Sequence, residues 1–362
     1  MSQPDALHPD LSGAFAEATV RSARLEAQLQ RDPGRHRILT GDRPTGPLHL
    51  GHYFGTLENR VRLQDRGVDL LVLVADYQTI IDRDSPASLA ADVEALLADY
   101  LAVGIDPARA TIFAHSQVEA LNQLVLPFLS LVSVAELSRN PTVKDEMAAA
   151  GLSQMSGLMF TYPVHQAADI LFCHATAVPV GKDQLPHLEL TRLIARRFNR
   201  RYSPGAALFP EPAALLSDAP LLLGTDGQKM SKSRGNAIAI SATADETARR
   251  ITGAKTDADR HITYDPLNRP EVSNLVLLGA LCREQPPERV AAEVGAGGSA
   301  ALKRLVVEAV NERFRDTRAR RRELAADPGY LRQVLRDGNE RARAIAGDTL
   351  RAVRTLMHTD YA

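Results

Sequence analysis

The stretch HRILTGDRPTGPLHLGHYFG, residues 36–55, decides the fold of this chain. It begins with an apolar run that predicts a strand over residues 36–40, and it continues through Gly41 into a Pro44-Thr-Gly-Pro47 turn. His49-Leu-Gly-His52 is then expected to open a helix. A strand that turns into a helix in this way presents free backbone N–H groups and the positive end of a helix dipole to an anion. The segment therefore predicts a nucleotide-binding unit.

Two imidazoles in this segment, His49 and His52, are spaced one helical turn apart and can donate hydrogen bonds to phosphate oxygens. Gly51 between them would let a backbone or an adenine ring come close. The alternative interpretation is a pair of exposed histidines or a metal pair on one helix face. A metal site is not favoured, because neither a third ligand nor a general-base Glu accompanies the pair.

A second polar segment, DGQKMSKSRGNAI at residues 226–238, carries two ammonium groups three residues apart, on Lys229 and Lys232. Glycines and serines surround them, so the segment predicts a mobile loop that closes over phosphates. Alone it could be a solvated basic turn. The combination with residues 36–55 favours a phosphate-binding site built from both segments.

Composition is typical of a soluble enzyme. The chain has 362 residues, of which 44% are hydrophobic, and this length favours two domains. No apolar run is long enough to span a membrane, and the N-terminus MSQPDALHPD lacks the pattern of a signal peptide, so a cytoplasmic location is expected. The two cysteines, Cys173 and Cys282, lie far apart, so neither a disulfide framework nor a cysteine zinc site is expected.

The order of apolar patterns predicts an α/β protein with four zones. Residues 1–35 read as an N-terminal extension with an amphipathic helix. Residues 36–240 read as a Rossmann-like catalytic domain with a parallel sheet and a helical insertion at about 121–175. Residues 241–362 read as an all-helical C-terminal domain. Within the catalytic domain we expect strands at 36–40, 69–75, 110–114 and 177–180, and a helix at 86–103.

Charge gives a weaker signal. The formal net charge is −1, so any contact with nucleic acid must be local. Arginines gather near the C-terminus, interleaved with acidic residues, and this pattern suits either a solvated helix face or contacts to phosphates. The cluster comprises Arg313, Arg315, Arg318, Arg320, Arg321 and Arg322, followed by Arg332, Arg336, Arg341, Arg343, Arg351 and Arg354.

The strand expected at 177–180 leads into Gly181-Lys-Asp-Gln184, a second strand-to-helix junction. Ligands of doubly wound sheets bind at the carboxyl ends of the strands, so this junction can meet the same nucleotide as His49 and His52. Gly181 suits a close approach to a ribose. Asp183 can accept from ribose hydroxyls, or it can cap the helix that follows.

With these motifs in place, the chain resembles the class I aminoacyl-tRNA synthetases, through His49-Leu-Gly-His52 and Lys229-Met-Ser-Lys-Ser233. Linking segments resemble the tryptophanyl-tRNA synthetases in particular, in a divergent second bacterial lineage. These segments are YLAVGIDP (100–107), ATIF (110–113), TYPVHQAADI (161–170) and VPVGKDQ (178–184). The resemblance implies a homodimer that uses ATP and Mg²⁺ to activate L-tryptophan and then charges the 3′-terminal adenosine of tRNA(Trp).

The resemblance also implies site residues. Catalytic groups that neutralise the phosphates would be His49, His52, Lys144, Lys229 and Lys232, and Mg²⁺ would have no protein ligand. ATP would contact Arg43, Pro44, Thr45, Gly51, His52, Gly181, Lys182, Asp183, Leu221, Lys229, Met230, Ser231, Lys232 and Ser233. Tryptophan would contact Leu39, Gln78, Tyr162, Gln166, Asp169, Val178, Val180 and Gln184.

Helical spacing places Tyr162, Gln166 and Asp169 on one side of a single helix. A carboxylate on the inner face of an apolar helix needs a partner, and the resemblance implies that the indole N–H of tryptophan is the partner of Asp169. Tyr162, Gln166 and Gln184 would then hold the α-amino and carboxylate groups, while Val178 and Val180 line the indole slot.

Four positions depart from the pattern of many bacterial members, which carry Met at Gln166, His at Gln78, Phe at Leu39 and Gln at Arg43. Gln166 also resembles the arrangement with which tyrosyl enzymes hold tyrosine. Two alternatives therefore stay open: a tyrosyl-tRNA synthetase, and a paralogue that keeps the fold for regulation without charging tRNA. The intact His49, His52, Lys229 and Lys232 favour catalysis over the second alternative.

Overall fold

Five parallel strands form the central sheet in the order β3-β2-β1-β4-β5. The computed structural model describes residues 9–80, 88–139, 155–181, 184–216, 221–232 and 234–361, with side chains from residue 18 onward. The strands are β1 (Arg37–Asp42), β2 (Asp69–Val74), β3 (Ala110–Ala114), β4 (Ala177–Val180) and β5 (Ala213–Leu216). The order reverses between β1 and β4, so the carboxyl ends of these two strands flank the switch point of a Rossmann-like sheet. The predicted fold class is confirmed.

Two details of the sheet differ from the prediction. Strand β1 extends two residues beyond Thr40, because Gly41 and Asp42 stay in register with Leu73 and Val74 of β2. A Cβ at position 41 would lie 2.3 Å from the carbonyl oxygen of Leu73, so only glycine lets the pairing continue there. Strand β5 was not predicted, since its sequence AALL carries no alternation and follows a Pro-rich stretch.

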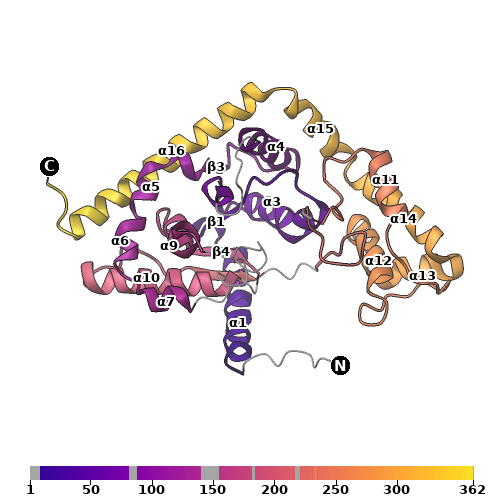
Figure 1. Ribbon diagram of the computed structural model, residues 1–362, viewed down its shortest axis with the longest axis horizontal. Helices are drawn as coiled ribbons and strands as arrows, with labels where there is room; N and C mark the ends of the chain where they lie inside the picture. Colours follow the sequence, from indigo (N-terminus) through magenta and orange to yellow (C-terminus); the bar gives the residue numbers. More distant parts are fainter. Residues whose placement is uncertain are drawn as a thin grey trace.

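Helices cover both faces of the sheet (Figure 1). Helices α3 (Glu58–Asp65) and α4 (Leu89–Ala102) share one apolar core with Ile38, Leu70 and Val72 of the strands. The opposite face bears Leu39, Phe113 and Val178 in a second core. That core includes residues of α5 (Glu119–Gln123), α6 (Val125–Leu129), α7 (Val134–Ser138), α9 (Gly157–Leu171) and α10 (Leu185–Tyr202). The mostly helical insertion predicted after residue 121 thus forms one face of the catalytic layer.

A helix protects each edge of the sheet. Helix α1 (Pro9–Arg31) packs on β5, where the backbone N–H of Leu216 donates to Ser22 Oγ at 2.8 Å. Helix α16 (Pro328–Leu356) packs on β3, and Asn339 Oδ1 accepts from the backbone N–H of Ala114 at 3.0 Å. A Cβ at Gly338 would lie 1.8 Å from the carbonyl oxygen of Ile112, so glycine is required for this close approach. Neither edge therefore presents a fully unpaired backbone.

Beyond Ile240 the described chain is almost entirely helical, as predicted. Helices α11 (Ala244–Thr252), α12 (Pro270–Arg283), α13 (Pro287–Val294) and α14 (Gly298–Arg313) gather at one end of the molecule (Figure 1). From there α15 (Arg315–Ala325) and α16 lead back across the catalytic layer to the C-terminus. No helix in the described part of the chain is both long and apolar enough to cross a membrane.

Candidate active site

The first signature forms the predicted strand-turn-helix unit at the carboxyl end of β1. Helix α2 (Leu50–His52) continues through a π-helical turn, Tyr53–Leu57, into α3. The backbone N–H of His49 donates to His52 Nδ1 at 3.2 Å, so the proton of the neutral His52 imidazole sits on Nε2. The two rings lie against each other, with their centroids 3.7 Å apart and their planes tilted by 34°. This arrangement leaves His52 Nε2–H as a hydrogen-bond donor at a helix start.

Burial lowers the pKa of both imidazoles. The pKa of His49 falls to about 3, through burial and through the nearby His52 and Lys232. The pKa of His52 falls to about 4, mainly through burial, with Asp42 acting in the opposite direction. Both rings are therefore neutral at pH 7. They can donate hydrogen bonds to a phosphate, but the positive charge must come from lysines.

The second signature lies directly against the first. The Lys232 ammonium donates to the carbonyl oxygen of Gly46 at 2.7 Å and to Thr45 Oγ1 at 3.3 Å. Backbone hydrogen bonds also join the two segments, from Leu50 N to Ile238 O at 3.0 Å and from Ile240 N to Leu48 O at 2.9 Å. Lys229 is exposed. The two phosphate-binding segments predicted from sequence are thus neighbours in space.

Gly51 has a different immediate neighbour from the one expected. A Cβ at this position would lie 3.0 Å from His49 Nδ1 and 3.6 Å from the sulfur of the buried Met230. The missing side chain therefore makes room for the imidazole of the same signature and for the loop of the other. That it also lets a nucleotide come close stays a prediction.

Asn236 fastens the second signature, and sequence analysis did not single it out. Its side chain is 3% exposed, and its Oδ1 accepts from the backbone N–H of Ser231 at 2.8 Å. Its Nδ2 donates to Asp226 Oδ1 at 2.7 Å and to the carbonyl oxygen of Lys229 at 3.2 Å. The sequence feature that could have indicated this role is the position of Asn236 directly after Gly235, at the end of the basic loop.

A buried charged network supports β1 beneath the first signature, and it too was missed. The Arg60 guanidinium, 2% exposed, pairs with Asp42 Oδ2, and the Tyr100 hydroxyl donates to the same oxygen at 2.7 Å. Burial raises the pKa of the Asp42 carboxyl, but Arg60 and Tyr100 outweigh this effect, so the pKa falls to about 2. Asp42 is therefore a fixed anion whose ligands are already supplied by the protein.

A second buried carboxylate joins the first signature to the C-terminal helices. Asp99 of α4 is fully buried, and its Oδ2 accepts from the backbone N–H of Leu48 at 2.8 Å. Its Oδ1 pairs with the guanidinium of Arg321 in α15. Burial raises the pKa of Asp99, and Arg321 opposes that shift.

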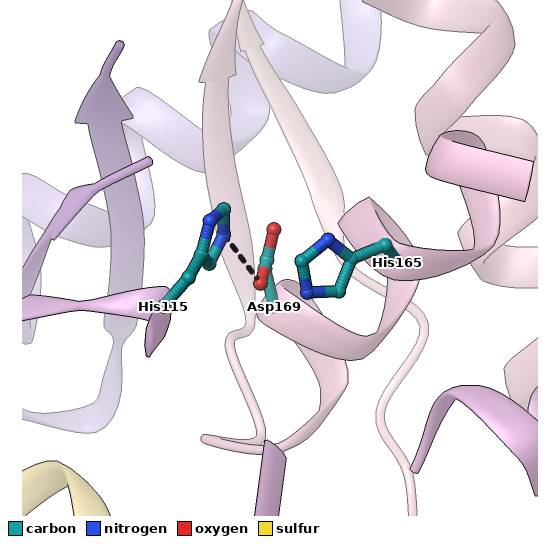
Figure 2. Close-up of side chains that lie close together, drawn as sticks. All are labelled: His115, His165 and Asp169. Atoms are coloured by element: carbon teal, nitrogen blue, oxygen red, sulfur yellow. Dashed lines mark ion pairs between the residues drawn. The ribbon is translucent and has the colours of Figure 1, made fainter. Parts of the chain in front are cut away.

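On the opposite face of the sheet, α9 carries the predicted amino-acid-binding residues. Tyr162 is buried, and its hydroxyl lies 3.1 Å from Nε2 of the fully buried His187. Asp169 is 1% exposed, and Oδ1 lies 2.9 Å from Nε2 of His115, the residue that directly follows β3 (Figure 2). Gln166 is half-buried. The charge of Asp169 thus has a partner inside the protein, which sequence analysis did not foresee.

His115 and His165 lie side by side next to Asp169, with ring centroids 4.6 Å apart (Figure 2). Burial lowers the pKa of His165, with Asp169 acting in the opposite direction. Burial would also lower the pKa of His115, but the Asp169 carboxylate outweighs it and raises the pKa. Asp76, which follows β2, lies 3.9 Å from His115 Nδ1 and accepts from the backbone N–H of Ser116 at 3.1 Å.

The remaining predicted residues divide between the two parts of the site. Leu39, Val178 and Val180 are buried in the same core as α9, as an indole slot between sheet and helix requires. Three polar or glycine positions follow strands or begin helices: Gln78 in the 3₁₀ turn after β2, Gly181 after β4, and Gln184 at the start of α10. Near the nucleotide segments, Pro44 is buried, whereas Arg43 and Leu221 are exposed. Lys144, Lys182, Asp183 and Ser233 lie outside the described residues.

Many of the C-terminal arginines form ion pairs or hydrogen bonds within the protein and so stabilise the fold. Arg313 pairs with Glu58 and Glu284, Arg318 is buried against Asn311 and Thr247, and Arg341 donates to backbone carbonyl oxygens at 107 and 110. By contrast, Arg320 and Arg322 are exposed and form no ion pair with the described residues. Much of the arginine cluster is therefore engaged in contacts within the protein, and phosphate contacts need not explain it.

Comparisons with known proteins show the family of this chain. Residues 31–315 match the family described as tRNA synthetases class I (W and Y). The chain is 41% identical over 342 residues to the tryptophan--tRNA ligase of Treponema pallidum (strain Nichols), covering 89% of this chain and 96% of that protein. It is 38% identical to the tryptophan--tRNA ligase of Clostridium longisporum, covering 90% of this chain and 97% of that protein.

Among solved structures, the tryptophanyl-tRNA synthetase of Campylobacter jejuni complexed with ADP and tryptophan is similar, with a TM-score of 0.78 and 30% identity. The similarity covers 89% of this chain and 99% of that one. A tyrosyl-tRNA synthetase from Archaeoglobus fulgidus, complexed with L-tyrosine, has a TM-score of 0.62 and 22% identity, which shows the shared fold alone.

Proposed function

Because this chain belongs to the class I tRNA synthetases for tryptophan and tyrosine, and to the tryptophan--tRNA ligases among them, we propose how it charges tRNA. It is a ligase that activates L-tryptophan with ATP and transfers it to the 3′-terminal adenosine of tRNA(Trp). The relatives at about 40% identity are tryptophan enzymes, so the tyrosyl alternative is not favoured. We propose that the protein acts in the cytoplasm, where tRNA is charged for protein synthesis.

One observation carries the proposal for the site: the two segments proposed to bind phosphate meet at the carboxyl end of β1, and α9, which carries Asp169, packs on one face of the same sheet. The contacts from Lys232 to Gly46 and Thr45 already hold the second segment against the first. Ligands of doubly wound sheets bind at such a switch point. An ATP bound across this edge of the sheet would meet an amino acid bound at α9. The two segments already lie together, so no domain movement is needed to join them.

The proposed chemistry needs positioning and charge more than covalent help. A carboxylate oxygen of tryptophan attacks the α-phosphate, a P–O bond to the β-phosphate breaks, and pyrophosphate leaves with the electron pair. The His52 Nε2–H would donate to a phosphate oxygen, while Lys229 and Lys232 would neutralise charge as it shifts to the leaving group. Lys144 is proposed for the same task by family resemblance.

Mg²⁺ would reach this site with ATP. Asp42, at the end of β1, is engaged by Arg60 and Tyr100 and is not available as a ligand. Mg²⁺ prefers oxygen ligands and is often held by substrate phosphates, which fits a site rich in imidazole and ammonium groups. When bound, it would supply further neutralisation of the phosphate charge.

For the amino acid, we propose that the indole ring lies between Leu39, Val178 and α9, with its N–H donating to Asp169. His115 would hold that carboxylate in place, since Nε2 lies 2.9 Å from Oδ1. Tyr162, Gln166 and Gln184 would contact the α-amino and carboxylate groups. A buried acceptor that only a matching donor can satisfy gives strong selectivity against amino acids that lack it.

We also propose a homodimer. Two large apolar side chains on the helical insertion are exposed, Leu126 of α6 at 76% and Val134 of α7 at 70%. Large exposed apolar side chains are candidates for part of a protein interface. A Leu126→Arg variant should therefore shift the mass measured by light scattering from dimer to monomer. An unchanged dimer mass would exclude this surface.

Charging assays test the function directly. The purified chain, incubated with ATP, Mg²⁺ and a tRNA(Trp) transcript, should form aminoacyl-tRNA with labelled tryptophan. A parallel reaction with tRNA(Tyr) and tyrosine is the control and should give no product. Charging of tRNA(Tyr) alone would contradict the proposal. No product with either pair would favour the regulatory paralogue.

A further inference from the structure

Three buried side chains converge beside the proposed indole slot, and the proposed tryptophan site uses two of them, Asp169 and His115. His165 and Asp169 stand one turn apart on α9, and His115 begins the 3₁₀ turn after β3. Their exposed fractions are 7%, 1% and 0%, respectively. Each offers one potential ligand atom, and these atoms all lie within 4.8 Å of one another (Figure 2).

Several polar atoms of this trio lack hydrogen bonds. His115 Nε2 and Asp169 Oδ1 approach each other to 2.9 Å as an ion pair. Apart from this contact, His115 Nδ1 and Asp169 Oδ2 make no hydrogen bond within the described part of the chain. Buried polar atoms nearly always have a hydrogen-bond partner, so the unpaired Asp169 Oδ2 points to a further ligand at this place.

Neighbouring groups set which nitrogen of His165 carries a lone pair. The Asn122 amide donates from Nδ2 to the carbonyl oxygens of His115 at 3.0 Å and Val118 at 3.2 Å. Its Oδ1 is therefore the atom that faces His165 Nε2 at 2.8 Å, and a carbonyl oxygen can only accept. The proton of His165 sits on Nε2, which leaves the lone pair on Nδ1.

His115 has a carboxylate near each of its ring nitrogens. Asp76 Oδ1 lies 3.9 Å from Nδ1, which favours the proton on that side, while Nε2 faces Asp169. Metal-binding histidines typically have this arrangement, in which the second ring nitrogen faces a carboxylate or a carbonyl oxygen. His165 thus has an outer partner and an inner lone pair, whereas Nε2 of His115, which is paired with Asp169, would release its proton when a metal binds.

We propose that His115, His165 and Asp169 bind a transition-metal dication of the Zn²⁺ class. Two imidazoles and one carboxylate with an open position suit Zn²⁺ or Co²⁺ and do not suit Mg²⁺, which prefers oxygen ligands. Metal–ligand distances of about 2.0–2.2 Å would draw the three ligand atoms closer together than their present spread, a movement within reach of side-chain rotation. This site is separate from the Mg²⁺ that accompanies ATP.

The cation and tryptophan would compete, a consequence that rests on the proposed function of Asp169. When the Asp169 carboxylate binds a metal, it is a weaker acceptor for the indole N–H of tryptophan. Zinc-class metals would therefore inhibit amino-acid activation reversibly, and a chelator would restore it.

Cobalt provides a direct probe, because its visible absorption reports coordination without any substrate. The metal-free full-length chain, titrated with Co²⁺, should bind one ion per chain with an intense visible band that Zn²⁺ abolishes. His165→Leu should lose this band, and the exposed His261 gives a matched control, since His261→Leu should retain it. Asn122→Ala should weaken binding about 10- to 100-fold, because it removes the outer partner of a ligand.

Circular dichroism and thermal unfolding in a chelator establish that each variant is folded, so loss of the band can be assigned to the site. The proposal is overturned if the wild-type chain shows no saturable band, or if His165→Leu binds as tightly as wild type. Excess L-tryptophan should displace Co²⁺; undiminished binding would overturn the competition while leaving the metal site standing. Activation of tryptophan by the metal-free chain is measured separately, so failure of the proposed function is distinguishable.

Discussion

At the scale of single residues, the site depends on glycines, which have no side chain, as much as on functional groups. Gly51 leaves room for the His49 ring, and Gly41 lets β1 remain paired up to Asp42. Neither role follows from a helix or strand pattern. Sequence could predict that His49, His52 and Lys232 act together, because their motifs have known spacing. It could not predict Asn236 or His115, because their partners come from distant segments.

Replacing Gly51 with alanine should impair ATP use. The new Cβ would lie 3.0–3.1 Å from two atoms of the His49 imidazole, so the ring must move. A displacement of this kind at a catalytic site can reduce the rate about 100-fold. Steady-state ATP–pyrophosphate exchange measures the loss. Gly55→Ala is the matched control, because a Cβ there meets nothing within 4 Å; equal activity of the two variants would refute the steric argument.

At the scale of elements, buried ion pairs hold the strands and helices that carry the first signature. Asp42 joins the end of β1 to Arg60 of α3 and Tyr100 of α4, and Asp99 joins α4 to α15. Apolar periodicity predicted α4 and the strands at 110–114 and 177–180. It gave no sign of these charged contacts, because a buried carboxylate looks the same in sequence as an exposed one.

Asp42→Asn should destabilise the fold strongly. The change leaves the Arg60 guanidinium buried without its counter-ion, and breaking a buried pair of this kind costs about 3–5 kcal/mol. Denaturant unfolding measures the change in the free energy of unfolding. Asp69→Asn is a matched control in the half-exposed Arg37–Asp69 pair, where less than about 1 kcal/mol is expected. Similar losses in both variants would contradict the role assigned to burial.

The neutral His52 should make the wild-type chain sensitive to acid. Its pKa is 6.5 when unfolded and about 4 when folded, so between these values the unfolded chain binds a proton that the folded chain does not. Its contribution is fully present above pH 6.5 and is lost as the pH falls through about 4. His52→Asn keeps an acceptor for the His49 N–H but does not titrate, so its free energy of unfolding should fall less between pH 6.5 and 4. Parallel pH profiles of the two chains would exclude this account.

At the scale of the whole molecule, the C-terminal helices serve the catalytic layer as well as any tRNA. Helix α16 covers the β3 edge through Gly338 and Asn339, and α15 reaches the first signature through Arg321. The boundary predicted near residue 240 marks a change to helical structure. That the last helix returns to the sheet could not be predicted, because its apolar face reads the same whether it packs on helices or on strands.

Arg320 and Arg322 are proposed to contact tRNA phosphates, since both are exposed and form no ion pair with the described residues. An Arg320→Gln, Arg322→Gln double variant should raise the KM for tRNA(Trp) and leave ATP–pyrophosphate exchange unchanged. The slope of log affinity against log salt should fall by about 1 for each arginine–phosphate interaction that the variant removes. Arg315→Gln serves as a control, because Arg315 is already paired with Glu312. An unchanged KM and salt slope would place tRNA elsewhere.

The most direct test of the central claim, that α9 and the two signatures form a tryptophan-activating site, is ATP–pyrophosphate exchange with tryptophan and tyrosine side by side. Because the buried Asp169 of the proposed slot is expected to accept from an indole N–H, we predict exchange that depends on tryptophan. Tyrosine should give no more than background. Exchange supported by tyrosine alone, or by neither amino acid, would contradict the account.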